Sequence, residues 1–332
     1  MKVAVYHSND DIRIEDRPRP VAGAGELVFR VRASGVCGSD VMEWYRMPKA
    51  PIVLGHEVAG EVVEAGPETA GFRQGDRIVA THHVPCGTCR YCATGREPAC
   101  ETLRTTHFDP GGLAEYVRLP AINVRLGAFP IPESVSFDEA SFVEPLACVV
   151  RGQRVAGGVS GKTVAILGSG MSGMLHLLWA RACGAARIVC TDVHPYRLEA
   201  ARRAGADAVL DARTERVPPG SADVAIVCTA APEAISQAAE AVDRGGTILM
   251  FALVPPGTRV DLPAHDLWSR GVSIVPSYAG PPRDMRTALD AIAAREVDVE
   301  SLITHRLPLS DAARAFRLVA QAGESMKVLV LP

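Results

Sequence analysis

The sequence lacks several features that define whole classes of protein. It contains no run of about twenty apolar residues, the length that a membrane-spanning helix requires. Its net charge of −3 gives no basic excess of the kind that attracts nucleic acid or anionic membranes. The N-terminal stretch MKVAVYHSNDD turns polar too early for a secretory signal peptide. We therefore expect a cytoplasmic protein that binds neither nucleic acid nor a membrane.

Internal repeats and low-complexity segments are absent as well, so the chain is not a repeat protein. Its 332 residues are too many for one ordinary core, and 48% hydrophobic with 22% charged residues is a globular composition. Two domains are expected. Nine cysteines are an odd number, which suits reduced thiols and metal ligands better than a disulfide framework.

Four of the cysteines form a compact C-x2-C-x2-C-x7-C pattern. They are Cys86, Cys89, Cys92 and Cys100. Short spacers allow one loop to wrap four thiolates around a zinc ion, and a tetrahedron of thiolates leaves no open position for a substrate. Unrelated buried thiols or two disulfides are the alternatives, but the surrounding Gly, Thr, Arg and Pro are not core residues. The pattern predicts a structural zinc site.

A second set of ligand types lies outside that loop. Cys37 begins a Cys-Gly-Ser-Asp tetrapeptide, and His56 and Glu57 stand at the head of an apolar strand. Thiolate and imidazole suit zinc, and a carboxylate from Glu57 or Glu144 would complete the shell. A lone histidine beside an apolar run is more often a core residue. The presence of Cys37 and of carboxylates in the same sequence favours a catalytic zinc site instead.

Strand patterns dominate roughly the first 120 residues, where apolar and polar residues alternate with a period of two. The expected strands are 2–6, 12–16, 26–33, 58–65 and 76–80.

The next motif is Gly168-Ser169-Gly170-Met171-Ser172-Gly173, which follows the apolar run Thr163 to Leu167 and opens a helical pattern. Asp192 ends the following strand, Arg187 to Thr191. This strand, loop, helix and acid context is what a dinucleotide site requires. The glycines admit a pyrophosphate at the helix N-terminus, and Asp192 would accept from both ribose hydroxyls of NAD while repelling a 2′-phosphate.

Alternating strands and helices continue at 196–204, 223–228, 232–242 and 246–251. They predict a parallel, doubly wound sheet whose ligand edge lies at the strand C-termini. The further residues expected at the cofactor are Arg197, Cys228, Thr229, Phe251 and Ala252. The tail should contain helices at 284–294 and 310–319, the latter capped by Ser310, and a last strand from Lys327 to Leu331.

Together these motifs resemble those of the zinc-containing medium-chain alcohol and polyol dehydrogenases, above all the sorbitol, idonate and sugar-alcohol-phosphate dehydrogenases. The resemblance covers nearly the whole chain. It is carried by Cys-Gly-Ser-Asp at 37–40, Gly-His-Glu at 55–57, Gly-Asp-Arg-Ile at 75–78, the four-cysteine loop, Glu-Pro-Leu at 144–146 and the dinucleotide motif.

The resemblance implies an α/β protein with a GroES-like β-rich catalytic domain and a Rossmann domain. The expected bounds are 1–147 for the catalytic domain with its structural zinc loop at 86–100, 148–283 for the Rossmann domain and 284–332 for a return to the catalytic domain. Two zinc ions and NAD are the implied cofactors. A homodimer or homotetramer is implied too, paired through the segments Thr258 to Leu262 and Gly271 to Ser277.

Roles for individual residues also follow from the resemblance. Cys37, His56 and Glu144 would surround the catalytic zinc, with Glu57 able to join or replace a ligand. Cys148 is a core cysteine in our interpretation, with a thiol ligand as the alternative. Ser39 would accept the proton of the alcohol substrate. Asp40 would orient His56.

Two departures from the family pattern concern the substrate region. Met42 stands where relatives often carry a proton-relaying histidine. The segment between Cys37 and His56 is shorter than in sorbitol dehydrogenase and holds Trp44, Tyr45, Arg46 and Lys49. These four residues either line the substrate pocket, where the bases would meet a phosphate or carboxylate, or face solvent.

The leading hypothesis is an NAD-dependent oxidation of a polyol, sugar alcohol, sugar acid or cyclitol. An aminocyclitol or sugar-phosphate substrate is an alternative within the family. A zinc-free quinone or enone reductase on the same fold is a second alternative, which the combined ligand set opposes. A regulatory zinc-finger protein would need a basic patch that the acidic balance does not support.

Overall fold

The chain divides into two units in the computed structural model, which describes residues 1–69 and 71–332. The first unit consists of Met1–Ala147 and Ala279–Pro332, and the second of Cys148–Tyr278. The return to the first unit thus begins a few residues before the expected position 284. The described residues include no helix that is both long and apolar enough to cross a bilayer.

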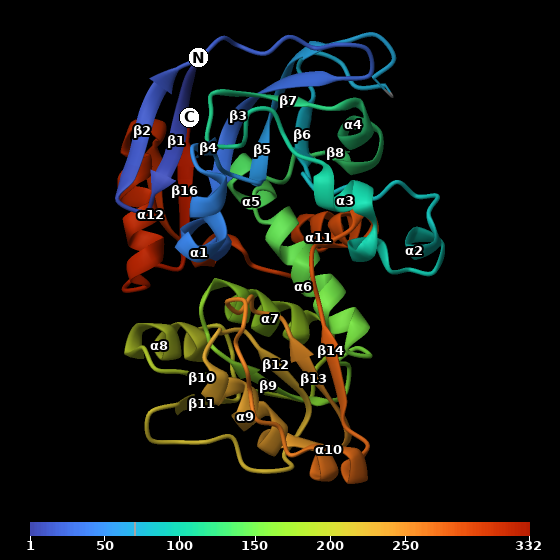
Figure 1. Cartoon of the computed structure of the whole chain (residues 1–332), viewed down its shortest axis with the longest axis vertical. Coiled ribbons are helices and arrows are strands. Elements are labelled where there is room, and N and C mark those ends of the chain that lie inside the picture. The colour runs from blue at the N-terminus through green and yellow to red at the C-terminus, as the bar shows by residue number, and fades with distance from the viewer. Residues whose placement is uncertain (70) are drawn as a thin grey trace. The chain divides into compact units, whose positions relative to one another are not determined.

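The first unit is built around β-sheets (Figure 1). One sheet has the order β2-β1-β4, and the other the order β15-β16-β3-β5-β6-β8, with β7 also paired to β3. The strands are β1 Lys2–Ser8, β2 Asp11–Asp16, β3 Leu27–Gly35, β4 Ile52–Val53, β5 Glu57–Ala65, β6 Arg77–Ala80, β7 Tyr116–Leu119, β8 Ala128–Pro130, β15 Ile303–Pro308 and β16 Lys327–Leu331. The sequence predicts the long strands well because each has apolar residues facing one core.

Helices of this unit are mostly short. They are α1 Glu43–Arg46, α2 Arg90–Ala93, α3 Glu101–Thr105, α4 Ala121–Gly127, α5 Phe137–Ala140, α11 Pro282–Ala293 and α12 Ala312–Gln321, and α6 Val143–Val155 spans the boundary between the units. α12 buries Phe316 against Tyr6, with ring centroids 5.7 Å apart. The predicted cap at Ser310 is wrong, because a 3₁₀ turn over Leu309–Asp311 precedes the helix and places Asp311 at the N-cap.

The second unit holds one parallel sheet with the strand order β11-β10-β9-β12-β13-β14. This order reverses direction between β9 and β12, which confirms the predicted doubly wound fold. Helices α7, α8 and α9 pack on the sheet (Figure 1). The elements are β9 Thr163–Leu167, α7 Met171–Ala182, β10 Arg187–Asp192, α8 Pro195–Arg203, β11 Ala208–Asp211, β12 Ala222–Val227, α9 Pro232–Ala241, β13 Val242–Met250, α10 Ala264–Arg270 and β14 Ser273–Pro276.

Candidate functional site

The four cysteines of the 86–100 loop come together in the first unit. Their Sγ atoms lie within 4.8 Å of one another. The Sγ atoms of Cys89 and Cys92 are 3.5 Å apart and those of Cys86 and Cys92 are 3.9 Å apart, distances too long for disulfide bonds. Hydrogen bonds from Thr88 and from backbone N–H groups lower the pKa of Cys86 to about 5, so this thiol ionises readily. Four converging thiols fit a closed zinc site.

A second donor group is formed by Cys37, His56 and Glu57, whose ligand atoms also lie within 4.8 Å of one another. Cys37 follows β3 and caps a 3₁₀ turn over Gly38–Val41, while His56 and Glu57 stand at the start of β5. The pairing of β3 with β5 sets Gly35 opposite Glu57 and so brings the two segments together. A thiolate, an imidazole and a carboxylate fit a zinc ion and leave one tetrahedral position for a substrate.

Asp40 lies behind this donor group with its side chain fully buried. Its Oδ2 accepts a hydrogen bond from the Cys37 N–H at 3.2 Å, and its Oδ1 is 3.5 Å from His56 Nδ1. Burial alone would lower the pKa of His56, but the charge of Asp40 and its hydrogen bond raise that pKa well above its ordinary value. Burial opposes the charge of Asp40, yet His56 and Arg46 outweigh it and lower the pKa of Asp40. Asp40 therefore holds one imidazole nitrogen and leaves the other for a metal.

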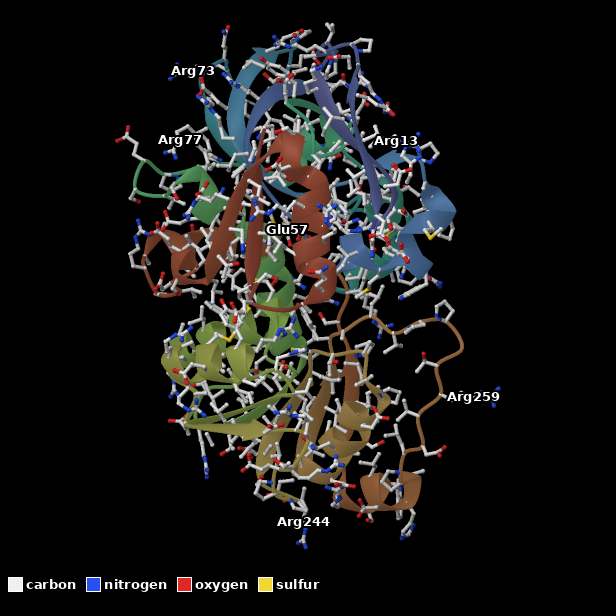
Figure 2. The ribbon with its side chains drawn as sticks, turned by 90° about the vertical axis from the view of Figure 1, so that its left-hand side faces the viewer. Arg13, Glu57, Arg73, Arg77, Arg244 and Arg259 are labelled. Atoms are coloured by element: carbon white, nitrogen blue, oxygen red, sulfur yellow. The ribbon has the colours of Figure 1, made fainter. Side chains whose placement is uncertain are left out.

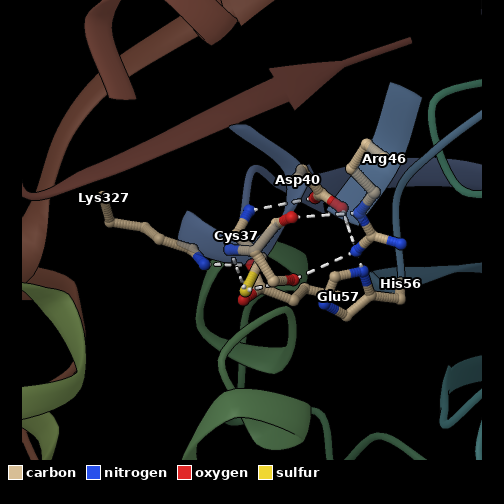
Figure 3. A network of polar contacts seen from close by, with 7 residues as sticks. Cys37, Asp40, Arg46, His56, Glu57 and Lys327 are labelled. Carbon is tan, nitrogen blue, oxygen red and sulfur yellow. Dashed lines mark hydrogen bonds and ion pairs between the residues drawn. The ribbon is translucent and has the colours of Figure 1, made fainter. Parts of the chain in front are cut away.

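Glu57 makes a buried ion pair with Lys327, whose side chain is 1% exposed (Figure 3). Figure 2 shows Glu57 inside the unit, whereas Arg13 and Arg73 project outward. Lys327 reaches the site because β16 pairs with β3, with Leu329 opposite Gly35. A side chain at Gly35 would overlap both the Glu57 carboxylate and the Lys327 ammonium, so glycine leaves the space that the pair occupies.

Glu144 lies outside the donor group that the described residues form. It is 5% exposed in the first turn of α6. The structure thus brings Glu57 into one group with Cys37 and His56, and the role of Glu144 stays a prediction.

Arg46 does not face solvent, which was one of the two positions that the sequence left open. Its side chain is only 13% exposed, and the guanidinium donates to the Ser39 carbonyl, to Ser39 Oγ and to Asp40 Oδ1 (Figure 3). The nearby Lys49 places its ammonium 3.9 Å from the centre of the Tyr45 ring. Arg46 thus supports the Cys-Gly-Ser-Asp turn, while Lys49 remains an exposed base.

Two histidines beside His56 escaped the sequence analysis. The His82 ring centroid lies 4.9 Å from that of His56 and 3.7 Å from that of His83. Burial lowers the pKa of His82 well below its ordinary value and that of His83 to about 4. Both rings are therefore neutral near pH 7. The sequence around the two histidines, Thr81 to Val84, contains no recognisable ligand spacing. Only the fold shows that these histidines lie beside His56.

The glycine-rich loop of the second unit links β9 to α7. Gly168 adopts a φ of +98°, and a side chain at Gly173 would overlap the Gly168 carbonyl. Gly170 is the N-cap of α7. Because glycine has no side chain, nothing at this position covers the backbone N–H groups at the start of the helix. This arrangement fits the pyrophosphate of a dinucleotide.

Asp192 ends β10 beside this loop with 6% exposure. Its Oδ2 accepts from the Ser169 N–H at 2.8 Å, and its Oδ1 accepts from the N–H groups of Val193 and His194. These bonds hold the carboxylate in place, and Oδ2 keeps a lone pair for a ligand hydroxyl. Arg197 Nη1 lies 3.8 Å from Oδ2.

Residues at the ends of β12 and β13 lie against the same loop or against each other. A side chain at Gly168 would meet Cys228 and Thr229 at 3.2 Å. The backbone N–H groups of Phe251 and Ala252 both donate to Val227 at the end of β12. The structure thus gathers these expected cofactor residues at one edge of the sheet.

Comparisons with known proteins show the family to which the chain belongs. The model of the alcohol dehydrogenase GroES-like domain matches residues 23–133, and the model of zinc-binding dehydrogenases matches residues 173–294. The chain is 31% identical to sorbitol dehydrogenase of Gallus gallus over 98% of its own length and 95% of the relative. It is also 31% identical to L-threonine 3-dehydrogenase of Klebsiella pneumoniae subsp. pneumoniae, over 97% of each chain.

One solved structure is similar throughout. It is a protein described as a zinc-binding dehydrogenase from Sinorhizobium meliloti 1021, bound to NADP. The two share 30% identity and a TM-score of 0.89, covering 100% of this chain and 99% of the other. From these matches, the chain belongs to the zinc-dependent medium-chain alcohol and polyol dehydrogenases and is an oxidoreductase that acts on alcohols.

Proposed function

We propose that the chain oxidises a secondary alcohol of a polyol, sugar alcohol, sugar acid or cyclitol, with zinc and NAD as cofactors. The observation that carries this proposal is the group of Cys37, His56 and Glu57 backed by the buried Asp40. A zinc-free quinone or enone reductase would have no use for these ligands. An aminocyclitol or a sugar phosphate stays an alternative substrate, and the relatives add L-threonine to the compounds worth testing.

The chain's own residues then take the following roles. Cys37, His56 and Glu57 would hold the zinc ion, which acts as a Lewis acid when bound. NAD, when bound, is the hydride acceptor. Asp40 orients His56, and Lys327 orients Glu57. Ser39, with its Oγ at 3.3 Å from Cys37 Sγ, accepts the proton of the substrate hydroxyl.

The first prediction concerns substrate and cofactor. We expect the enzyme to oxidise at least one alcohol of the proposed classes, measured by the absorbance of the reduced cofactor. With that alcohol, kcat/KM should be larger for NAD than for NADP. The Asp192 carboxylate repels a 2′-phosphate. Asp192→Ser should narrow or reverse the preference, because Arg197 would then meet the phosphate without a competing carboxylate. Equal use of both cofactors by the unmodified enzyme would contradict this assignment.

The second prediction concerns metal content. Two separate donor groups imply two zinc ions per chain, and a chelator should remove the one at the open site first. Glu57→Gln should reduce the zinc content toward one ion, whereas Glu144→Gln should retain two, because only Glu57 lies within the donor group. Elemental analysis of the purified unmodified protein and of each variant measures this. The reverse pattern would make Glu144 the ligand.

The third prediction concerns the proton path. Ser39→Ala should lower kcat by roughly 10²–10⁴-fold, the usual effect of removing a positioned proton-transfer group. Zinc content and NAD affinity should stay nearly constant, since Ser39 holds neither. Met42→His serves as a control that should retain activity, because no step requires the thioether. Full kcat in Ser39→Ala across the pH range would assign the proton transfer to another group.

Assembly gives the fourth prediction. β14 lies at the edge of the parallel sheet, and an apolar groove of ≈ 250 Å³ beside it is lined by residues that include Val260, Leu262 and Ile274. Ile274 is 43% exposed. Pairing of two such edges would cover this surface, so we expect a homodimer or homotetramer. Ile274→Asp should shift the protein toward monomers in light scattering. A monomeric unmodified protein at micromolar concentration would refute the proposal.

A further inference from the structure

The guanidinium of Arg46 is bound to the residue proposed to accept the substrate proton. Arg46 ends the short helix α1, and its side chain turns back onto the 3₁₀ turn over Gly38–Val41 (Figure 3). Nε donates to the Ser39 carbonyl at 3.0 Å, and Nη2 donates to Ser39 Oγ at 3.0 Å and to Asp40 Oδ1 at 2.8 Å. One side chain thus donates hydrogen bonds to both the backbone and the side chain of Ser39.

These contacts fix the direction of hydrogen bonding at Ser39. A guanidinium only donates, so Ser39 Oγ accepts from Arg46 with one of its two lone pairs. The hydroxyl hydrogen is directed toward Cys37 Sγ at 3.3 Å. One lone pair is left, and it is the one that can accept the proton of a substrate hydroxyl. Arg46 therefore sets the orientation in which Ser39 meets the substrate.

The positive charge also bears on the proton transfer itself. When the hydrogen of Ser39 leaves ahead of the incoming substrate proton, negative charge develops on Oγ, and a donor held at 3.0 Å stabilises that charge. A guanidinium stays protonated, so Arg46 does not relay a proton in place of a histidine at position 42. It acts through Ser39.

A role as a receptor for a substrate anion fits the structure less well. The three hydrogen bonds engage three of the five N–H groups of the guanidinium, and the side chain is 13% exposed. Its charge is already paired with the buried carboxylate of Asp40.

We propose that Arg46 is a positioning residue that orients the Ser39 hydroxyl and stabilises the charge on its oxygen during proton transfer. In that transfer the O–H bond of the substrate breaks and a new O–H bond forms on Ser39 Oγ. The original hydrogen of Ser39 first turns from Cys37 Sγ toward water, and its O–H bond then breaks as it passes to that water. The proposal rests on the proposed dehydrogenase function.

The test compares Arg46→Met, which removes the donors at similar size, with Arg46→Lys, which keeps the charge. Using an alcohol that the unmodified enzyme oxidises, Arg46→Met should lower kcat by roughly 10²-fold, as the loss of a positioned donor does elsewhere, with KM nearly unchanged. Arg46→Lys should lose less, and added guanidinium ion should restore part of the activity of Arg46→Met. The solvent isotope effect on kcat should rise, since proton transfer becomes slower. Arg73→Met removes an arginine that is 88% exposed and is the control.

A double-mutant cycle with Ser39→Ala separates this role from a structural one. If Arg46 acts through Ser39, Arg46→Met should lower kcat little further once Ser39 is alanine. The proposal would be overturned if the fold-loss of kcat in the double variant equalled the product of the two single losses. Full kcat in Arg46→Met would overturn it as well.

Two readouts do not depend on activity. The zinc content of Arg46→Met should match that of the unmodified enzyme, and a crystal structure of the variant should show Ser39 in more than one rotamer. A single, unchanged Ser39 rotamer would also overturn the proposal. If no alcohol is oxidised by the unmodified enzyme, the proposed function fails, and the Ser39 rotamer still decides the role of Arg46.

Discussion

The buried carboxylate of Asp40 is the constraint on which the candidate catalytic site depends. A carboxylate removed from water costs several kcal/mol unless charges and hydrogen bonds compensate it. Here the compensation comes from the Cys37 N–H, the Arg46 guanidinium and the His56 imidazole. Because all three partners converge on one group, the positions of a thiol, an imidazole and a hydroxyl-bearing turn are coupled to each other.

The two donor groups differ in how the chain assembles them, and this difference matches their proposed roles. The four thiols come from one loop over residues 86–100, so local spacing alone brings them together. The group of Cys37, His56 and Glu57 requires the pairing of β3 with β5, and its support by Lys327 requires β16 as well. A site held by a sheet is rigid enough to leave one metal position open for a substrate.

In the second unit, too, a buried carboxylate is held by several hydrogen bonds at the proposed binding site. Backbone N–H groups from Ser169, Val193 and His194 hold the Asp192 carboxylate before any ligand arrives. The ends of β9 and β12 meet where the strand order reverses, which is where doubly wound sheets bind nucleotides. Binding energy is then not spent on ordering the carboxylate.

The sequence by itself determined the features that depend on neighbours along the chain. The bounds of β9 and β16 agree with the apolar runs at Thr163–Leu167 and Lys327–Leu331. The cysteine spacing and the strand, loop and helix context of the glycine motif likewise report local geometry. These signals were enough for the fold class and the family.

Only the tertiary structure decided which distant groups meet. Lys327 is separated from Glu57 by 270 positions, and no periodicity encodes their contact, which follows from the register of β16 on β3. From the sequence Arg46 could either line the substrate pocket or face solvent, and it is the buried charge of Asp40 that holds its guanidinium inward. Hydrophobic patterns indicate which faces are buried, whereas the partner of a buried charge depends on how strands and turns are arranged in space.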